Sequence, residues 1–393
     1  MTGDELIASA NVATGARFGG GSFGSDGENP EAALINVNGT LYGTTTEPQG
    51  GTVYSISTTG TQRVLHSFAH YFGRDGSVPR ASLVDVAGTL YGTTSAGGLL
   101  CRPVGCGTVF SITTGGVIKV LHSFGGGSDG AKPFASLINV NGTLYGTTTA
   151  GGSGCDCGTI FSITTSGSEN VLYSFTGGPQ DGATPLGNLI NVNGTLYGTT
   201  YYGGSHCASS TKLGCGTVFS VTIAGSEKVL HTFGYGSDGA NPAGGLINVN
   251  GMLYGTTEVG GPGKDGTVYS ISATGTEKVL HGFSGHADGT FPVAGLINVH
   301  GTLYGTTLSG GTYFVCMAYG SCGTIFSVTT SGTEKVLYNF TGFSDGATPF
   351  AGLINLNGTL YGTTAFGGGD GCSYSFGCGT VFAFTPGGRN VRL

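Results

Sequence analysis

The sequence predicts an all-β protein, a seven-bladed β-propeller with four antiparallel strands in each blade. The first observation is the pentapeptide Leu-Tyr-Gly-Thr-Thr, which occurs seven times at intervals of 49 to 57 residues. A repeat of about 40–50 residues is typical of propeller blades and not of helical arrays. The second observation is that each repeat holds four short strand patterns and no helical period. The seven motif tyrosines are Tyr42, Tyr91, Tyr145, Tyr197, Tyr254, Tyr304 and Tyr361.

The third repeat shows how one blade is built. Residues 137–140 form an apolar β pattern, and Asn141 and Gly142 make a two-residue turn of the kind that needs positive φ angles. We expect the following strands at 143–148, 158–164 and 169–175. The seven blades are expected at about residues 31–68, 80–124, 134–175, 186–233, 243–283, 293–340 and 350–393.

The two ends of the chain are expected to meet in the seventh blade. Residues 379–385 and 389–393 are predicted to be its last two strands, which leaves the N-terminal segment 1–18 surplus to a propeller at 19–393. Residues 16–18 resemble the end of a fourth strand. We expect this segment to pair with the seventh blade, because an open ring would expose two sheet edges.

Composition excludes several classes of partner. The chain has 80 glycines among 393 residues, a formal net charge of −7 and only 14 lysines and arginines. Without a basic run, a nucleic-acid partner is not expected. No stretch of about 18 apolar residues is present, so no membrane span is expected. The first fifteen residues lack the basic and apolar regions of a secretion signal.

The ten cysteines fall in pairs, each between a Leu-Tyr-Gly-Thr-Thr motif and the next Gly-Thr. Five pairs, each within one loop, favour local disulfides and an oxidising compartment. The alternative is metal binding, but the spacings vary and a zinc site needs four ligands in defined geometry. The pair separated by a single residue is the weakest, because a bridge there is strained. The pairs are Cys101 and Cys106, Cys155 and Cys157, Cys207 and Cys215, Cys316 and Cys322, and Cys372 and Cys378.

A second signature, Asp-Gly-x-x-Pro, lies between the blades. Seven acidic residues on one ring could bind a cation or act in catalysis, but repetition in every blade favours a scaffold role. We expect each aspartate to accept its own downstream amides in a turn. The strand histidines His66, His122, His231 and His281 are expected to be packing residues, because tyrosine takes their place in two blades. The aspartates are Asp26, Asp75, Asp129, Asp181, Asp238, Asp288 and Asp345.

Function is expected where the repeats differ. The connections between the second and third strands hold 5, 12, 9, 15, 8, 15 and 14 residues, and they should share one face. Short connections in blades one and five would leave a groove open at both ends, which suits a linear polymer; undirected drift in loop length is the alternative. Aromatic residues in these loops would stack on sugar rings, or pack beneath their own loops. They are Tyr201, Tyr202, Tyr313, Phe314, Tyr319, Phe366, Tyr374 and Phe376.

Catalytic candidates are sparse. His70, Tyr71, Arg74 and Arg80 are the residue types that a polysaccharide lyase would need as acid, base and uronate partner. A glycoside hydrolase needs two carboxylates within about 5–9.5 Å. The acidic residues outside the repeat pattern mostly belong to different blades, and Glu47 and Glu258 are expected near opposite ends of the groove as ligand-binding residues. These acidic residues are Glu47, Asp156, Glu258, Asp265 and Asp370.

The repeat resembles a known family. The run Leu-Ile-Asn-Val-Asn-Gly-Thr-Leu-Tyr-Gly-Thr-Thr, followed by Gly-Gly and Gly-Thr-Val-Phe-Ser-Ile, is similar to the GloVer-type tandem repeat of secreted bacterial proteins, from residue 34 to 382. It also resembles kelch repeats distantly, although this chain has no tryptophan. The resemblance implies a propeller and export, and it implies no defined activity.

Together these observations predict a secreted propeller, extracellular or at the cell surface, that binds a carbohydrate or another linear polymer in the loop-face groove. A polysaccharide-degrading enzyme in the same groove is the first alternative, with a lyase ahead of a hydrolase. A structural or protein-interaction module is the second. We expect a monomer, with no cofactor and no metal.

Overall fold

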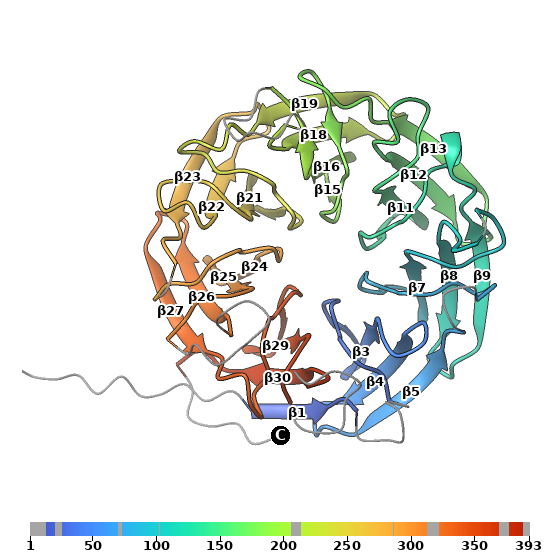
Figure 1. Cartoon of the computed structure of the whole chain (residues 1–393), viewed down its shortest axis with the longest axis horizontal. Coiled ribbons are helices and arrows are strands. Elements are labelled where there is room, and N and C mark those ends of the chain that lie inside the picture. The colour runs from blue at the N-terminus through green and yellow to red at the C-terminus, as the bar shows by residue number, and fades with distance from the viewer. Residues whose placement is uncertain are drawn as a thin grey trace, which may run out of the picture.

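The predicted seven-bladed β-propeller is confirmed. The structure, a computed structural model, describes residues 13–19, 26–69, 73–101, 103–205, 214–285, 287–312, 322–368 and 377–387. Within them, seven four-stranded antiparallel sheets stand around one axis (Figure 1). The described residues contain one short 3-10 turn, η1 (Gly127–Asp129), and no helix among them is long and apolar enough to cross a membrane.

Each sheet runs from an innermost to an outermost strand in chain order, except for the seventh. Blade 1 holds β2 (Ile35–Val37), β3 (Thr40–Thr45), β4 (Thr52–Ser57) and β5 (Gln62–Ser67). Blade 2 holds β6 (Val84–Val86), β7 (Thr89–Thr94), β8 (Thr108–Thr113) and β9 (Ile118–Ser123). Blade 3 holds β10 (Ile138–Val140), β11 (Thr143–Thr148), β12 (Thr159–Thr164) and β13 (Glu169–Ser174).

The remaining blades repeat this plan. Blade 4 holds β15 (Ile190–Val192), β16 (Thr195–Thr200), β18 (Thr217–Thr222) and β19 (Glu227–Thr232), with a small ladder of β14 (Gly182–Ala183) and β17 (Tyr202–Gly203) beside it. Blade 5 holds β20 (Ile247–Val249), β21 (Met252–Thr257), β22 (Thr267–Ile271) and β23 (Glu277–Gly282). Blade 6 holds β24 (Ile297–Val299), β25 (Thr302–Thr307), β26 (Thr324–Thr329) and β27 (Glu334–Asn339). Blade 7 holds β28 (Ile354–Leu356), β29 (Thr359–Thr364), β30 (Thr380–Phe384) and β1 (Ala13–Arg17).

The ring closes through strand β1. It pairs antiparallel with β30, with Ala13 opposite Ala383 and Arg17 opposite Thr380, and is the outermost strand of blade 7. The N-terminal segment therefore supplies the fourth strand of blade 7. It is not an addition to four strands from the C-terminal part of the chain. Residues 389–393, which the sequence assigned to the last strand, lie outside the described residues, and β1 holds the place beside β30.

The Leu-Tyr-Gly-Thr-Thr motif is explained by packing at three of its positions. In blade 3, Leu144 is fully buried, and a β-carbon on Gly146 would lie 2.7 Å from Cζ of Phe161. Glycine is therefore needed for the Phe161 ring to cover the second strand. The hydroxyls of Thr148 and Thr159 are buried and lie 2.8 Å apart, so each hydroxyl has a hydrogen-bond partner away from water.

Neighbouring blades are joined by aromatic rings and by threonine. Phe124, just after the outer strand of blade 2, packs edge-on against Phe161 of blade 3 with ring centroids 5.2 Å apart. Phe18 and Tyr54 make the same contact between blades 7 and 1 at 5.0 Å. There the Thr363 hydroxyl also donates to the carbonyl of Ala32 at 3.2 Å. The apolar core of the described residues therefore lies between blades, as seven clusters, one at each blade junction.

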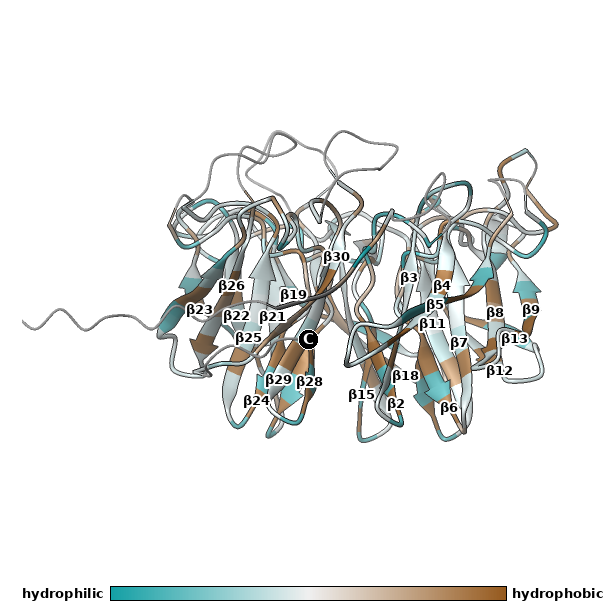
Figure 2. Cartoon of the chain, turned by 90° about the horizontal axis from the view of Figure 1, so that it is seen from below, coloured by the Kyte–Doolittle hydropathy of each residue, from teal (hydrophilic) through white to brown (hydrophobic). Residues whose placement is uncertain are grey.

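The two faces of the ring differ (Figure 2). On one, which we call the hairpin face, two-residue turns join the first and second strands. Asn141 and Gly142 have φ of 53° and 87°, and the Asn139 side chain accepts the Gly142 N–H at 2.9 Å. On the opposite one, the loop face, lie the connections between the second and third strands and those between blades.

The loop face carries the cysteines. Cys101–Cys106 and Cys155–Cys157 are disulfides, including the pair separated by one residue. Cys215, Cys322 and Cys378 are also disulfide-bonded. Their predicted partners, Cys207, Cys316 and Cys372, lie outside the described residues. The described cysteines are thus all oxidised, as the paired pattern predicts.

Candidate functional site

The candidate site lies on the loop face, at a repeated position where the type of residue differs between blades. The residue just after each Leu-Tyr-Gly-Thr-Thr motif is a small hydroxyl residue in the first three blades. The hydroxyls of Thr46, Ser95 and Thr149 each donate to a carbonyl of the preceding linker, at 3.2, 3.0 and 3.0 Å. In blades 4 and 5 the same position holds Tyr201 and Glu258. Large functional groups therefore replace a local hydrogen bond at this place.

Tyr201 and Glu258 come together across the junction of blades 4 and 5. Their side chains interact, and the pKa of Tyr201 is raised by burial and then by the Glu258 carboxylate. Burial also raises the pKa of Glu258, and the interaction with Tyr201 partly opposes this shift. The Tyr202 ring stands perpendicular to Tyr201 with centroids 4.8 Å apart, and the Asn241 side chain donates to the Tyr201 carbonyl at 2.9 Å. Both tyrosines and Glu258 keep part of their surface exposed.

A second cluster lies at the junction of blades 1 and 2. Arg80 forms an ion pair with Glu31, and its guanidinium carbon lies 5.5 Å from the centre of the Phe134 ring, in blade 3. Burial raises the pKa of Glu31, Arg80 lowers it, and the nearby Glu47 raises it. Two carboxylates, one cation and one aromatic face are therefore gathered here.

The chain course places this second cluster at the inner rim of the loop face, close to the axis of the ring. Each first strand runs along the inner side of its blade from the loop face to the hairpin face, so the residue just after the linker proline lies at its inner, loop-face end (Figures 1 and 2). Neighbouring segments touch here, because Ser82 N–H donates to the Ser136 hydroxyl at 2.9 Å and Ser136 N–H to Asn188 at 2.7 Å. Around this ring the position is charged in blades 1 and 2 and apolar elsewhere: Glu31, Arg80, Phe134, Leu186, Ala243, Val293 and Phe350.

The predicted groove aromatics divide into three groups. Tyr201 and Tyr202 belong to the site described above. Phe366 packs against the core cluster of Phe340 and Phe382 between blades 6 and 7, and is only partly exposed. The others, Tyr313, Phe314, Tyr319, Tyr374 and Phe376, lie outside the described residues, as does most of the connection that carries each of them.

The structure separates the two described members of the lyase set. Arg74 is exposed beside Asp75, whose carboxylate binds His66 of the outermost strand at 2.8 Å. Arg80 instead reaches Glu31 at the inner end of the blade. His70 and Tyr71 lie outside the described residues. Arg80 and Glu47 thus share a cluster that the sequence did not predict, and Glu31, its central carboxylate, was missed.

The repeated aspartates and histidines also turn out to be partners. Asp129 is hydrogen-bonded to His122 at 3.1 Å, and Asp181 and Asp345 accept from Tyr173 and Tyr338 at 2.9 and 2.8 Å. Carboxylate oxygens of Asp238 and Asp288 lie 3.3 Å from Nε2 of His231 and His281. The expectation that each repeated aspartate accepts hydrogen bonds from its own downstream amides was mostly wrong. Gly125 and Gly234, each four residues upstream, donate to Asp129 and Asp238, because the linker folds back on the strand end. The signal that could have shown this pairing is the separation of seven to nine residues in every case.

Comparison with solved structures gives distant similarities at low sequence identity. A candidate 6-phosphogluconolactonase from Bacteroides uniformis has a TM-score of 0.49 at 12% identity, covering 78% of this chain and 83% of that one. A gluconolactonase from Xanthomonas campestris has a TM-score of 0.41 at 12% identity, covering 71% and 79%. PorZ, a surface component of the type-IX secretion system of Porphyromonas gingivalis, has a TM-score of 0.48 at 12% identity, covering 90% and 46%.

These likenesses carry no information on activity or ligand. No match was found among proteins of curated function. The family comparison is decisive in contrast, because the model of the Gloeobacter/Verrucomicrobia repeat matches residues 9–212 and 206–393, nearly the whole chain. The resemblance seen in the repeat is therefore confirmed, and the protein belongs to the Gloeobacter/Verrucomicrobia repeat family.

Proposed function

We propose that this propeller is an extracellular or cell-surface protein that binds a linear carbohydrate polymer across its loop face. The observation that carries the proposal is the group of Tyr201, Tyr202 and Glu258. Tyr201 and Glu258 replace the small hydroxyl residues that blades 1 to 3 carry at the equivalent position. Perpendicular, partly exposed tyrosine rings beside a carboxylate offer a sugar both an apolar face and hydrogen-bond acceptors.

The second cluster supports an elongated ligand. One of the two polar clusters, at the junction of blades 1 and 2, holds Glu31, Glu47 and Arg80. The other, at the junction of blades 4 and 5, holds Tyr201 and Glu258. Between them lie the apolar residues that follow the linker prolines of the other blades. The connections of blades 1 and 5 are the two shortest on this face. A polymer that runs from one cluster to the other would meet polar groups at both ends and apolar side chains in the middle.

The disulfides support an oxidising location. Cytosolic proteins of ordinary organisms rarely keep structural disulfides, whereas secreted proteins commonly do. The low charge and the hydroxyl-rich composition also suit a ligand that is recognised by hydrogen bonds and ring stacking. In this proposal the protein acts as a monomer.

The test is binding to a panel of soluble neutral and acidic polysaccharides by affinity electrophoresis. We expect retardation on at least one polysaccharide, and about a tenfold loss of affinity in Tyr201→Ala/Tyr202→Ala, which is about 1.4 kcal/mol. The matched control is Tyr235→Ala, an exposed tyrosine in the linker between blades 4 and 5. No binding across the panel, or equal effects of both variants, would overturn the proposal.

A second candidate function is glycan cleavage by the Glu31 and Glu47 cluster, at the inner rim of the loop face. Glu31 and Glu47 interact, and the pKa of Glu31 is raised chiefly by burial, as in the general acid of a glycosidase. Release of reducing ends that stops in Glu31→Gln would favour this function. Binding without release would leave the protein as a lectin-like module.

A further inference from the structure

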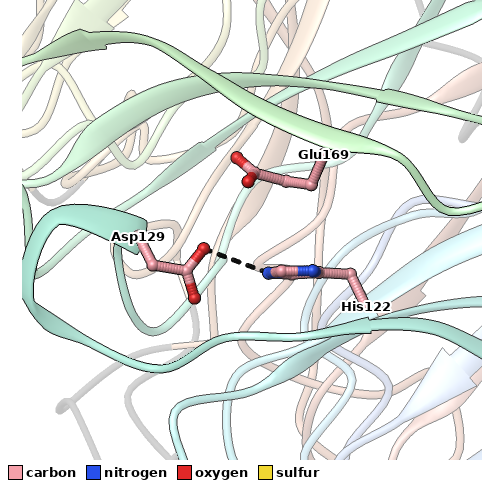
Figure 3. Close-up of side chains that lie close together, drawn as sticks. All are labelled: His122, Asp129 and Glu169. Carbon is pink, nitrogen blue, oxygen red and sulfur yellow. Dashed lines mark hydrogen bonds and ion pairs between the residues drawn. The ribbon is translucent and has the colours of Figure 1, made fainter.

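A cluster of metal-binding side chains lies on the outer side of the ring, away from the loop-face site. His122 belongs to the outer strand β9 of blade 2, Asp129 ends the 3-10 turn η1, and Glu169 begins the outer strand β13 of blade 3. One ligand atom from each lies within 4.8 Å of the other two. Figure 3 shows the imidazole and the two carboxylates converging from these three elements.

The Asp129 and His122 side chains are held by their surroundings, and the backbone of Glu169 is fixed in a sheet. The Gly125 N–H donates to Oδ2 of Asp129 at 2.5 Å, which leaves Oδ1 facing Nε2 of His122 at 3.1 Å. The His122 ring stands edge-on to Phe124 with centroids 4.9 Å apart. Glu169 is paired with Ile163 in the sheet of blade 3. Contacts of this kind orient metal ligands in known sites.

In the part of the chain that the structure describes, no lysine or arginine forms an ion pair with Asp129 or Glu169, and His122 is paired only with Asp129. Oε1 of Glu169 is buried and has no hydrogen-bond partner among the described residues. A buried carboxylate oxygen without a donor is costly, and a bound cation would remove that cost. The same oxygen is unpartnered in Glu277 and Glu334, so the close approach of three ligand atoms is what distinguishes this junction.

Two other blade junctions can be compared with this cluster. The junctions between blades 4 and 5 and between blades 5 and 6 carry the same residue types: His231, Asp238 and Glu277, and His281, Asp288 and Glu334. There the histidine-to-aspartate contact is 3.3 Å in both cases. Among the described residues, only the junction of blades 2 and 3 brings all three ligand atoms together.

We propose that His122, Asp129 and Glu169 bind one Zn²⁺ ion that ties the outer strand of blade 2 to that of blade 3. One nitrogen and two carboxylate oxygens form a three-ligand set, and water would complete four-coordination. An imidazole ligand favours zinc over Ca²⁺ or Mg²⁺, which prefer oxygen ligands. Zinc–ligand bonds of about 2.0–2.2 Å would require the three ligand atoms to lie somewhat closer together than they do here.

The test measures zinc bound to the full chain after equilibrium dialysis against micromolar Zn²⁺. We expect one zinc ion per chain, a rise in Tm on zinc addition, and loss of both in Glu169→Gln. The matched control is Glu334→Gln, which changes the same residue type at a junction that does not gather its ligands. It should keep the bound zinc and the rise in Tm.

Thermal unfolding of each variant without metal shows whether it folds. Glu169→Gln should unfold no earlier than the wild-type protein, because it removes a buried charge. Absence of bound zinc in the wild-type protein would overturn the proposal. So would zinc retained by Glu169→Gln, or zinc lost equally from Glu169→Gln and Glu334→Gln.

Discussion

The hairpin face and the loop face are built from the same seven repeats, yet they differ in how far the repeats agree. On the hairpin face, Asn139 and Asn248 accept turn amides at 2.9 and 2.8 Å, as do their equivalents in the other blades. On the loop face, Thr149, Tyr201 and Glu258 occupy one equivalent position with three different chemistries. Agreement marks the residues that every blade needs to fold, and divergence marks the residues available for a ligand.

The largest effect on stability is expected from substitutions at two glycines of blade 3, one in a strand and one in a loop-face connection. Gly146→Val places atoms against the buried Phe161 ring and Leu137, and we expect a loss of about 3 kcal/mol of unfolding free energy. Gly154 belongs to the loop-face connection, and a β-carbon added there would meet no other atom within 4 Å. Gly154→Val should therefore change stability by less than about 0.5 kcal/mol. Chemical denaturation measures both, and equal losses would break the comparison.

A smaller effect is expected at the blade junctions, where Glu277 faces His231, Asp238 and Tyr269. Burial raises the pKa of Glu277 to about 7, so the stability of the folded state falls as pH rises from about 4.5 through 7. Glu277→Gln removes this loss. Allowing for solvent screening, the variant should gain about 1 kcal/mol relative to the wild-type protein between pH 5 and pH 8.

Blade 1 already carries glutamine at this position. The Gln62 side chain donates to the carbonyl of Asp26 at 3.0 Å, which shows that the amide fits at a junction. The control is Lys278→Gln, at the exposed neighbour of Glu277. A Glu277→Gln variant whose stability follows the same pH profile as the wild-type protein would contradict the assigned cause.

The smallest effect concerns the one hairpin turn with alanine at its first position. Ala87 has a φ of 52°, a conformation that asparagine adopts at less cost than alanine. Ala87→Asn should therefore stabilise the protein by about 0.5 kcal/mol. The reciprocal change Asn141→Ala should destabilise blade 3 by a similar amount. Denaturation midpoints that move the same way in both variants would contradict the role given to these turns.

Much of the fold follows from residues that repeat. The Asn141 and Gly142 turn and the strand limits of blade 3 were both predictable, because they depend on contacts within one blade. The outermost strand of blade 7 was harder to assign, since residues 389–393 and the N-terminal strand carried similar patterns. Only the register of β1 on β30 and the contact of Phe18 with Tyr54 distinguish them.

The candidate sites were less predictable, because they depend on contacts between blades. Tyr201 and Glu258 were each singled out from the sequence, but their contact depends on equivalent positions being neighbours around the ring. Glu31 and Glu169 carry no motif of their own. Their importance comes from Arg80 of the following blade and His122 of the preceding blade, which are brought close by the packing of neighbouring blades.

The most direct test of the proposed loop-face site is a hydrogen-exchange footprint of the protein with a saturating oligosaccharide, chosen from the polysaccharide that retards it. Slower exchange is expected in segments 46–51, 201–205 and 258–265, with no change in the hairpin turns at 38–39, 141–142 and 250–251. Protection of the hairpin turns without protection of the loop-face segments would show that the ligand binds elsewhere and that divergence among the repeats does not mark the site.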